Sequence, residues 1–159
     1  MKQLNPTYQQ LLQRLFATAP KLYFPLTSHD VIAIVVRGLN VDNTHHLANL
    51  LVHEKCEITS LNLGWNKIRD TGALVIANAL QSEHCKITEL KLESNKIGDD
   101  GVIALANTLQ SEHCKITELN LYNNDIGPEG AIALANALQS EHCKITSLDL
   151  RDNCIGPEG

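Results

Sequence analysis

The stretch CKITELKLESNKI, residues 85–97, decides the fold because it recurs almost unchanged along the chain. Related stretches begin at Cys56, Cys114 and Cys143, so successive copies are separated by 29 residues. A fixed period of roughly 20–50 residues is typical of stacked repeats, in which each unit packs mainly on its neighbours. We therefore expect one strand, one turn and one helix per period.

The local pattern within a unit supports this expectation. Leu61 and Leu63 alternate with polar residues, as in a short strand with one buried face. The segment that follows is predicted to be a helix that carries Leu74, Ala77 and Leu80 on one face. Stacking such units gives a parallel sheet covered by helices, so the predicted fold class is α/β.

One asparagine follows each predicted strand, where the chain turns. A buried turn leaves backbone donors and acceptors that need partners, and an amide side chain can both donate and accept. We expect these residues to form a ladder through the stack: Asn66, Asn95, Asn124 and Asn153.

The segment from Cys56 to Gly159 resembles the ribonuclease-inhibitor type of leucine-rich repeat, which is found in that inhibitor, in NOD-like receptors and in effectors secreted by intracellular bacteria. The resemblance rests on the period together with the patterns L-x-L-x-x-N-x-I and L-A-N-x-L. It implies a right-handed solenoid, a segment of a horseshoe, with a parallel sheet on the concave face and helices on the convex face. The close similarity between the repeats suggests recent duplication, which is more like the bacterial effectors.

The region before Cys56 follows the same plan less closely. Residues 27–55 are interpreted as a degenerate first repeat, in which Ile32 aligns with Leu61 and Arg37 replaces the ladder asparagine. Residues 1–26 contain an amphipathic pattern that predicts a helix capping the N-terminal end of the stack.

The other end of the sequence raises a different question. Gly159 is equivalent to Gly130, so the last repeat has a strand and a turn but no helix. Ile145, Leu148 and Leu150 would then lack a cover. We expect either that further repeats follow or that an end-to-end contact hides this edge.

The repeats also show which positions vary. The core positions stay constant, whereas outward positions on the predicted sheet and its rim change chemistry from repeat to repeat, as recognition surfaces of solenoids do. These are the candidate partner-binding residues: Asn62, Gly64, Trp65, Lys91, Glu93, Asn120, Tyr122, Asn123, Asp149, Arg151 and Asp152.

Two aromatic residues are the predicted anchors of this surface. Trp65 and Tyr122 stand at outward positions, where a partner would cover their apolar area. Arg151, Glu93 and Asp152 would form a polar rim that selects the partner. The alternative is that Trp65 packs on an adjacent repeat and has no binding role.

Composition excludes several function classes. The net charge of −5 disfavours non-specific binding to nucleic acid or to an anionic membrane. The sequence contains no signal-peptide core and no apolar run of about 20 residues that could span a bilayer. It also lacks a phosphate-binding loop, a metalloprotease helix and a nucleophile elbow. We expect no enzymatic activity and no cofactor.

Cysteine and histidine recur as adjacent pairs, such as His84-Cys85 and His113-Cys114. Adjacent residues of an extended segment point in opposite directions, so the cysteines should face the core and the histidines the solvent. No metal site and no disulfide framework is therefore expected. Cys154 breaks the series at a turn and is interpreted as incidental, with a reactive thiol as the alternative.

The leading hypothesis is a protein-binding module in reducing cytosol that uses the concave sheet, with a secreted bacterial effector acting on a host protein in the host cytosol as its specific form. One alternative is a targeting domain of a larger enzyme, for instance a ubiquitin ligase. The other is a structural protein that self-associates through the C-terminal edge.

Overall fold

The computed structural model describes residues 21–23, 33–39 and 41–159. Of the predicted N-terminal helical cap, residues 1–26, the structure describes only residues 21–23, which form a strand, and the predicted helix itself lies outside the described residues. Strands and helices alternate along the described part, with these bounds: β1 Lys21–Tyr23, β2 Ala33–Arg37, α2 Val41–Leu51, β3 Ser60–Asn62, α3 Arg69–Leu80, β4 Glu89–Lys91, α4 Asp99–Leu109, β5 Glu118–Asn120, α5 Pro128–Ala137 and β6 Ser147–Asp149.

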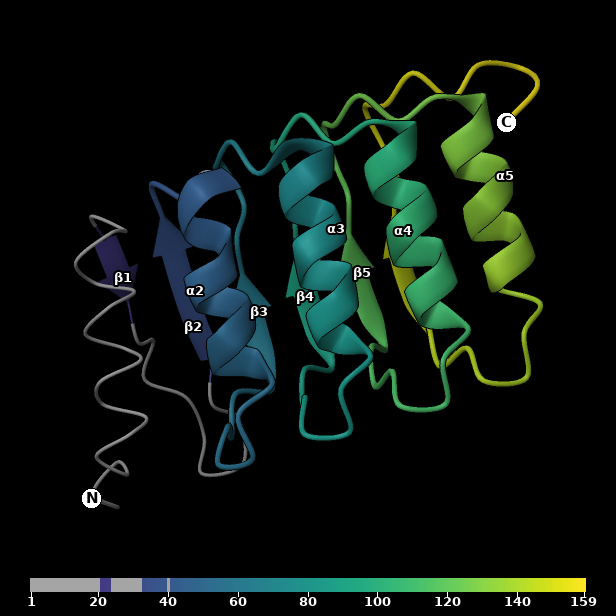
Figure 1. The fold of residues 1–159 in the computed structure, drawn as a ribbon. Helices are drawn as coiled ribbons and strands as arrows, with labels where there is room; N and C mark the ends of the chain where they lie inside the picture. The colour runs from purple at the N-terminus through teal and green to yellow at the C-terminus, as the bar shows by residue number, and fades with distance from the viewer. Residues whose placement is uncertain (1–20, 24–32, 40) are drawn as a thin grey trace.

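The strands form one sheet in sequence order, and helices α2 to α5 form a row along one side of it (Figure 1). Strands β2 to β6 are parallel, as the repeat predicts, and the fold is a right-handed α/β solenoid with its sheet on the concave face and its helices on the convex face. Strand β1 pairs antiparallel with β2 at the N-terminal edge. The repeat pattern did not predict this strand because β1 is not part of a repeat.

The leucines and isoleucines of each repeat line a continuous core between sheet and helices. Leu61 and Leu63 are fully buried, as predicted. In α3 the buried face contains Ala73, Ile76, Ala77 and Leu80, whereas Leu74 is 48% exposed. The prediction that Leu74 shares a face with Leu80 was wrong, because at about 100° per residue positions six apart diverge by roughly 120°.

The asparagine ladder is confirmed. Asn95 is buried, and its amide nitrogen donates to the carbonyl oxygens of Leu63 at 2.9 Å and of Leu92 at 3.1 Å. Its side-chain oxygen accepts the N–H of Ile68 at 3.3 Å. One amide thus bonds to backbone in its own repeat and in the preceding one, which fixes the turn and joins the two repeats.

The first repeat departs from the predicted alignment by two residues. Ile34, and not Ile32, pairs with Leu61, and Ala33 pairs with Ser60. Downstream, Leu39 donates its N–H to Asn66 just as Ile68 does to Asn95, which restores the 29-residue offset. The connection after β2 is therefore shorter, and Arg37 lies within the strand, not at a ladder position.

Aspartates at the helix starts join successive repeats. Oδ1 of Asp70, in α3, accepts the N–H groups of Gly98 at 2.6 Å and Gly101 at 3.1 Å, at the start of α4. Asp99 does the same for Gly127 and Gly130 at 2.7 and 2.8 Å, at the start of α5. Helices α4 and α5 have no side-chain cap of their own. Each is capped by the repeat before it.

Burial decreases toward the last repeat. Ile116, Leu119 and Leu121 are buried, whereas their equivalents in the last repeat are half-buried and pack at the margin of the core: Ile145, Leu148 and Leu150. Cys143 is likewise half-buried, in contrast to Cys114.

Candidate functional site

The candidate site lies on the concave face of the sheet, opposite the helices. Because Leu61, Leu90, Leu119 and Leu148 are in register, the residues on either side of each leucine form straight columns across the strands. The predicted column of Asn62, Lys91, Asn120 and Asp149 is confirmed by this pairing. A second column, two residues earlier, was missed: Ser60, Glu89, Glu118 and Ser147. The alternation of the strand, extended back by one step, would have revealed it.

Several predicted binding residues also stabilise the sheet locally. The side-chain oxygens of Asn62, Asn120 and Asp149 each accept the N–H two residues further along, at 3.0, 2.9 and 3.1 Å. Lys91 has no acceptor oxygen and instead forms an ion pair with Glu89. Glu89 also accepts a hydrogen bond from the Ser60 hydroxyl at 2.6 Å. The Lys91 contact, followed by the Ser60 bond, lowers the pKa of Glu89.

Gly64 and Glu93 form one packed unit. Gly64 is buried, so it offers no side chain and little surface to a partner. A Cβ at this position would meet the Glu93 side chain, so the absence of a side chain at Gly64 leaves the space that the Glu93 carboxylate occupies. Its assignment as a contact residue does not fit this geometry, whereas half-buried Glu93 stays at the surface as predicted.

Tyr122, Arg151 and two aspartates form a cluster over β5 and β6. The Arg151 guanidinium lies 5.8 Å from the centroid of the Tyr122 ring. It also donates two hydrogen bonds to Asp149, at 2.9 and 2.7 Å. The Asp152 carboxylate, through its hydrogen bond and its charge, raises the pKa of the Tyr122 hydroxyl. The side chains expected to contact a partner therefore bind one another.

Asn123 lies beside this cluster at the rim. It is exposed, has a φ of 52°, and donates from its amide to the Ser94 hydroxyl at 2.8 Å. Asparagine tolerates the left-handed conformation better than most residues, so its presence here has a local structural reason.

Trp65 occupies the equivalent rim position after β3, two strands from β5 toward the N-terminal edge, and its environment is different. Its side chain is 67% exposed, so neither adjacent repeat buries it. Its φ is 59°, in the left-handed region, and its N–H is held by the Glu93 carbonyl at 2.8 Å. Trp65 borders a depression that is also lined by Gly38, Leu39 and Lys67.

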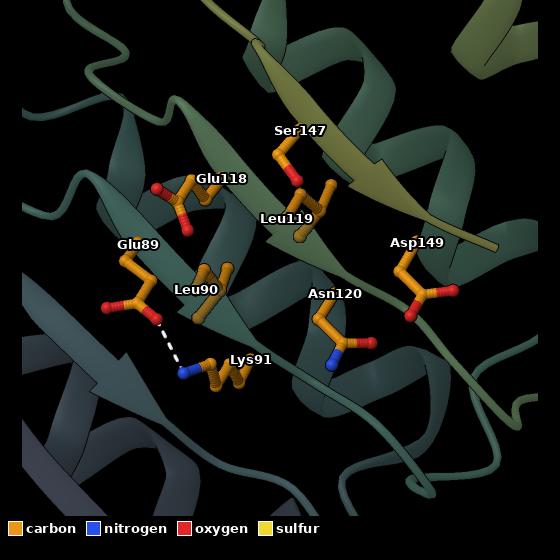
Figure 2. Close-up of a pocket in the computed structure, with 8 residues that line it drawn as sticks. All are labelled: Glu89, Leu90, Lys91, Glu118, Leu119, Asn120, Ser147 and Asp149. Atoms are coloured by element: carbon orange, nitrogen blue, oxygen red, sulfur yellow. Dashed lines mark ion pairs between the residues drawn. The ribbon is translucent and has the colours of Figure 1, made fainter.

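A hollow of about 190 Å³ lies over β4, β5 and β6 (Figure 2). Figure 2 shows acidic and polar side chains in front of the strands, with the helices behind the strands, on the side where Leu90 and Leu119 are buried. The lining residues come from both columns: Glu89, Leu90, Lys91, Glu118, Leu119, Asn120, Ser147 and Asp149. Ligand pockets for small molecules are usually about 300–1,000 Å³, so this hollow matches a single side chain better.

The cysteines and histidines behave as the strand geometry predicts. Cys56, Cys85 and Cys114 are buried in the core, and His84 and His113 are exposed. Burial raises the pKa of Cys85 to about 11, so this thiol is protonated at neutral pH. Within residues 21–23, 33–39 and 41–159, no three His, Cys, Asp or Glu side chains are arranged to hold a metal ion. Cys154 is an exposed thiol at the last turn.

Comparison with known proteins identifies the repeat. The family model described as leucine-rich repeat matches residues 55–77, 83–106, 112–135 and 141–159. These segments make up more than half of the chain, and the protein therefore belongs to the leucine-rich repeat family. No curated protein sequence matches the chain.

Solved structures show the same fold. The chain is similar to a structure titled "Leiomodin-1 Actin-Binding Site 2 (ABS2)", with a TM-score of 0.64 and 20% sequence identity. The similarity covers 91% of this chain and 79% of that one. Among the helices of the described ranges, none has the length and apolar character that crossing a bilayer requires.

Proposed function

We propose that this protein is a protein-interaction module whose partner docks on the concave face of the sheet, with Trp65 as an anchor. The observation that carries the proposal is the combination of exposure and backbone strain at Trp65. A large aromatic side chain, 67% exposed, occupies a position with a φ of 59°.

The fold alone does not account for a tryptophan there. A left-handed conformation costs an ordinary L-residue about 1–2 kcal/mol. The equivalent positions contain Ser94, Asn123 and Asp152, which also have positive φ values but are small polar residues. Tryptophan gains little packing in exchange, because most of its surface remains in solvent. Exposed aromatic residues of this kind are typical centres of protein interfaces.

The relationship to known structures supports a protein as the ligand. The similar structure is titled as an actin-binding site, so a repeat array of this fold has a protein partner in that case. At 20% identity the comparison does not transfer that partner to this chain.

The test compares Trp65→Asn with the unaltered chain in cross-linking and pull-down experiments, followed by affinity measurement with each protein recovered. Asparagine is chosen because Asn123 adopts the same backbone conformation in another repeat. Leu74→Gln is the matched control, because Leu74 is exposed on the helix side and this change also removes exposed apolar area. Trp65→Asn should lower affinity at least about tenfold.

Leu74→Gln should retain the affinity of the unaltered chain. Equal binding by Trp65→Asn and the unaltered chain would contradict the proposal. Loss of binding only in Leu74→Gln would move the interface to the helices.

We further propose the ribonuclease-inhibitor subtype and a role as a bacterial effector that acts on a host protein in reducing host cytosol. The near-identity of the repeats and the five free cysteines support this assignment. Detection of the protein in infected host cells, in fractions that contain no bacteria, would test it. Retention inside the bacterium would contradict it.

Self-association through the last repeat is a second candidate function. Ile145, Leu148 and Leu150 are only half-buried, and Leu138 nearby is 44% exposed. Light scattering over a concentration series should then show a rise in mass that Leu148→Lys abolishes. A constant monomer mass would contradict it.

A further inference from the structure

We infer that the segment bound on the concave face is basic, and that a lysine or arginine of the partner enters the hollow over β4 to β6. This inference rests on the proposed function and specifies the chemistry of the partner. The described concave residues include two cations, Lys91 and Arg151, but a larger set of carboxylates: Glu89, Glu93, Glu118, Asp149 and Asp152.

Both cations of this face already have carboxylate partners. Lys91 pairs with Glu89, and Arg151 binds Asp149 through two hydrogen bonds. Glu118 is exposed, lies between these pairs on β5, and has no ion pair or hydrogen bond from its side chain within the described part of the chain. A negative charge therefore remains at the centre of the hollow.

The shape of the hollow suits a long basic side chain. The strand backbone at Leu90 and Leu119 forms its base, with the leucine side chains directed into the core, and Glu118, Asn120 and Ser147 stand around it (Figure 2). Lysine and arginine have an aliphatic stem that packs on apolar surface and a charged end that seeks acceptors. The aliphatic parts of Glu89, Lys91 and Glu118 can contact the stem, and the acidic and amide acceptors at the margin can bind the charged end. An acidic side chain would instead meet Glu118 and Glu89, which costs binding energy.

A second observation, outside the hollow, also indicates a missing donor. One carboxylate oxygen of Glu93, Oε2, is buried and has no hydrogen-bond donor among the described residues. Buried acceptors without a partner are rare because they lose their hydration. Glu93 follows Lys91 by two residues and lies between the hollow and Trp65. The Trp65 N–H donates to the Glu93 carbonyl oxygen. A basic segment that runs from the hollow toward Trp65 would supply a donor to this carboxylate when the Glu93 side chain turns outward.

The experiment uses the full chain and a phage library of random linear dodecapeptides. The immobilised chain is the bait, and peptides that also bind the Trp65→Asn variant equally well are discarded. The remaining peptides should be enriched in lysine and arginine relative to the unselected library. Their binding should weaken as salt is raised, because exposed charges are screened over about 8–10 Å at moderate ionic strength.

Two charge-reversal variants then locate the contact. Glu118→Lys should lower the affinity of the selected peptides about tenfold, because it places a cation where the partner's cation binds. Glu141→Lys changes the net charge equally but lies at an exposed position after α5, and it should change affinity by less than about twofold. Circular dichroism confirms that both variants remain folded.

The outcomes separate this inference from the proposed function. Peptides that depend on Trp65 but are neutral or acidic would overturn the basic partner and leave the concave interface standing. Equal losses in Glu118→Lys and Glu141→Lys would also overturn it, because the attraction would then come from net charge alone. Recovery of no peptide that depends on Trp65 would count against both.

Discussion

The two ends of the concave face use equivalent positions in different ways. Over β5 and β6, Arg151 stacks on Tyr122 and binds Asp149, so the side chains satisfy one another. At β3, Gly64 replaces the aromatic or charged residue, and Trp65 stands exposed on a left-handed backbone. The comparison teaches that variation between repeats does not by itself mark an interface. Variation is most informative where the neighbouring repeats leave the side chain without a partner.

The largest effect on stability is expected from the asparagine ladder, which connects the two ends of the concave face. Asn95→Ala removes hydrogen bonds to Leu63, Leu92 and Ile68 at a buried turn. The free energy of unfolding should fall by about 3 kcal/mol, because buried backbone groups lose their partners. Urea unfolding measures this value. Asn107→Ala, at an exposed position in α4, is the control and should not lower it, because alanine favours the helix.

The next effect tests how the repeats are joined. Asp99→Ala should lower the free energy of unfolding by about 1–2 kcal/mol, because Asp99 caps the next helix through Gly127 and Gly130. Asp100→Ala, in the same helix turn but exposed, should cost less than about 0.5 kcal/mol. If the two aspartates acted only on the helix dipole, both variants would lose similar stability. Equal losses for Asp99→Ala and Asp100→Ala in thermal or urea unfolding would therefore refute the cap between repeats.

Trp65→Asn should act in the opposite direction on stability. Relief of the left-handed strain should raise the free energy of unfolding by about 1 kcal/mol, while partner binding is lost. Calorimetry and the binding assay together measure both changes. A destabilised Trp65→Asn variant would mean that the tryptophan packs into the fold, and the contrast between the two ends would disappear.

The smallest effect concerns the cluster over β5 and β6, in which the side chains bind one another. The folded chain holds the Tyr122 proton more tightly than the unfolded chain does, because Asp152 raises the pKa of the hydroxyl. The resulting stabilisation is present below the ordinary tyrosine pKa of 10.0 and is lost as pH rises through the higher folded value. NMR titration of Tyr122 should show this raised pKa, and Asp152→Asn should lower it. An unchanged titration would show that the two side chains do not interact.

Much of the scaffold could be predicted from particular residues. The cysteine at the start of each repeat, the paired leucines and the asparagine each report a local requirement that recurs, and all three were placed correctly. The helix face was misjudged at Leu74 because three apolar residues were matched without following the full rotation of the helix. The first repeat was misaligned because two residues are missing from a connection, which a constant period conceals.

The candidate site was predictable only in part. The outward columns follow from the alternation of side chains along a strand. Whether each of these side chains is exposed or in contact with another depends on the adjacent repeat. Gly64 lies beneath Glu93, 29 residues away, and Arg151 lies over Tyr122, also 29 residues away. No local pattern encodes such contacts.

The sequence by itself determined the repeating unit, its order and its ladder, because these depend on hydrogen bonds and burial that every repeat satisfies in the same way. Only the tertiary structure decided which helix Asp99 caps, how β2 meets β3, and which outward side chains remain unpaired. These features depend on the offset between stacked repeats and on side-chain contacts across them. Stacking therefore left Trp65 and Glu118 available to a partner and engaged Arg151 within the fold.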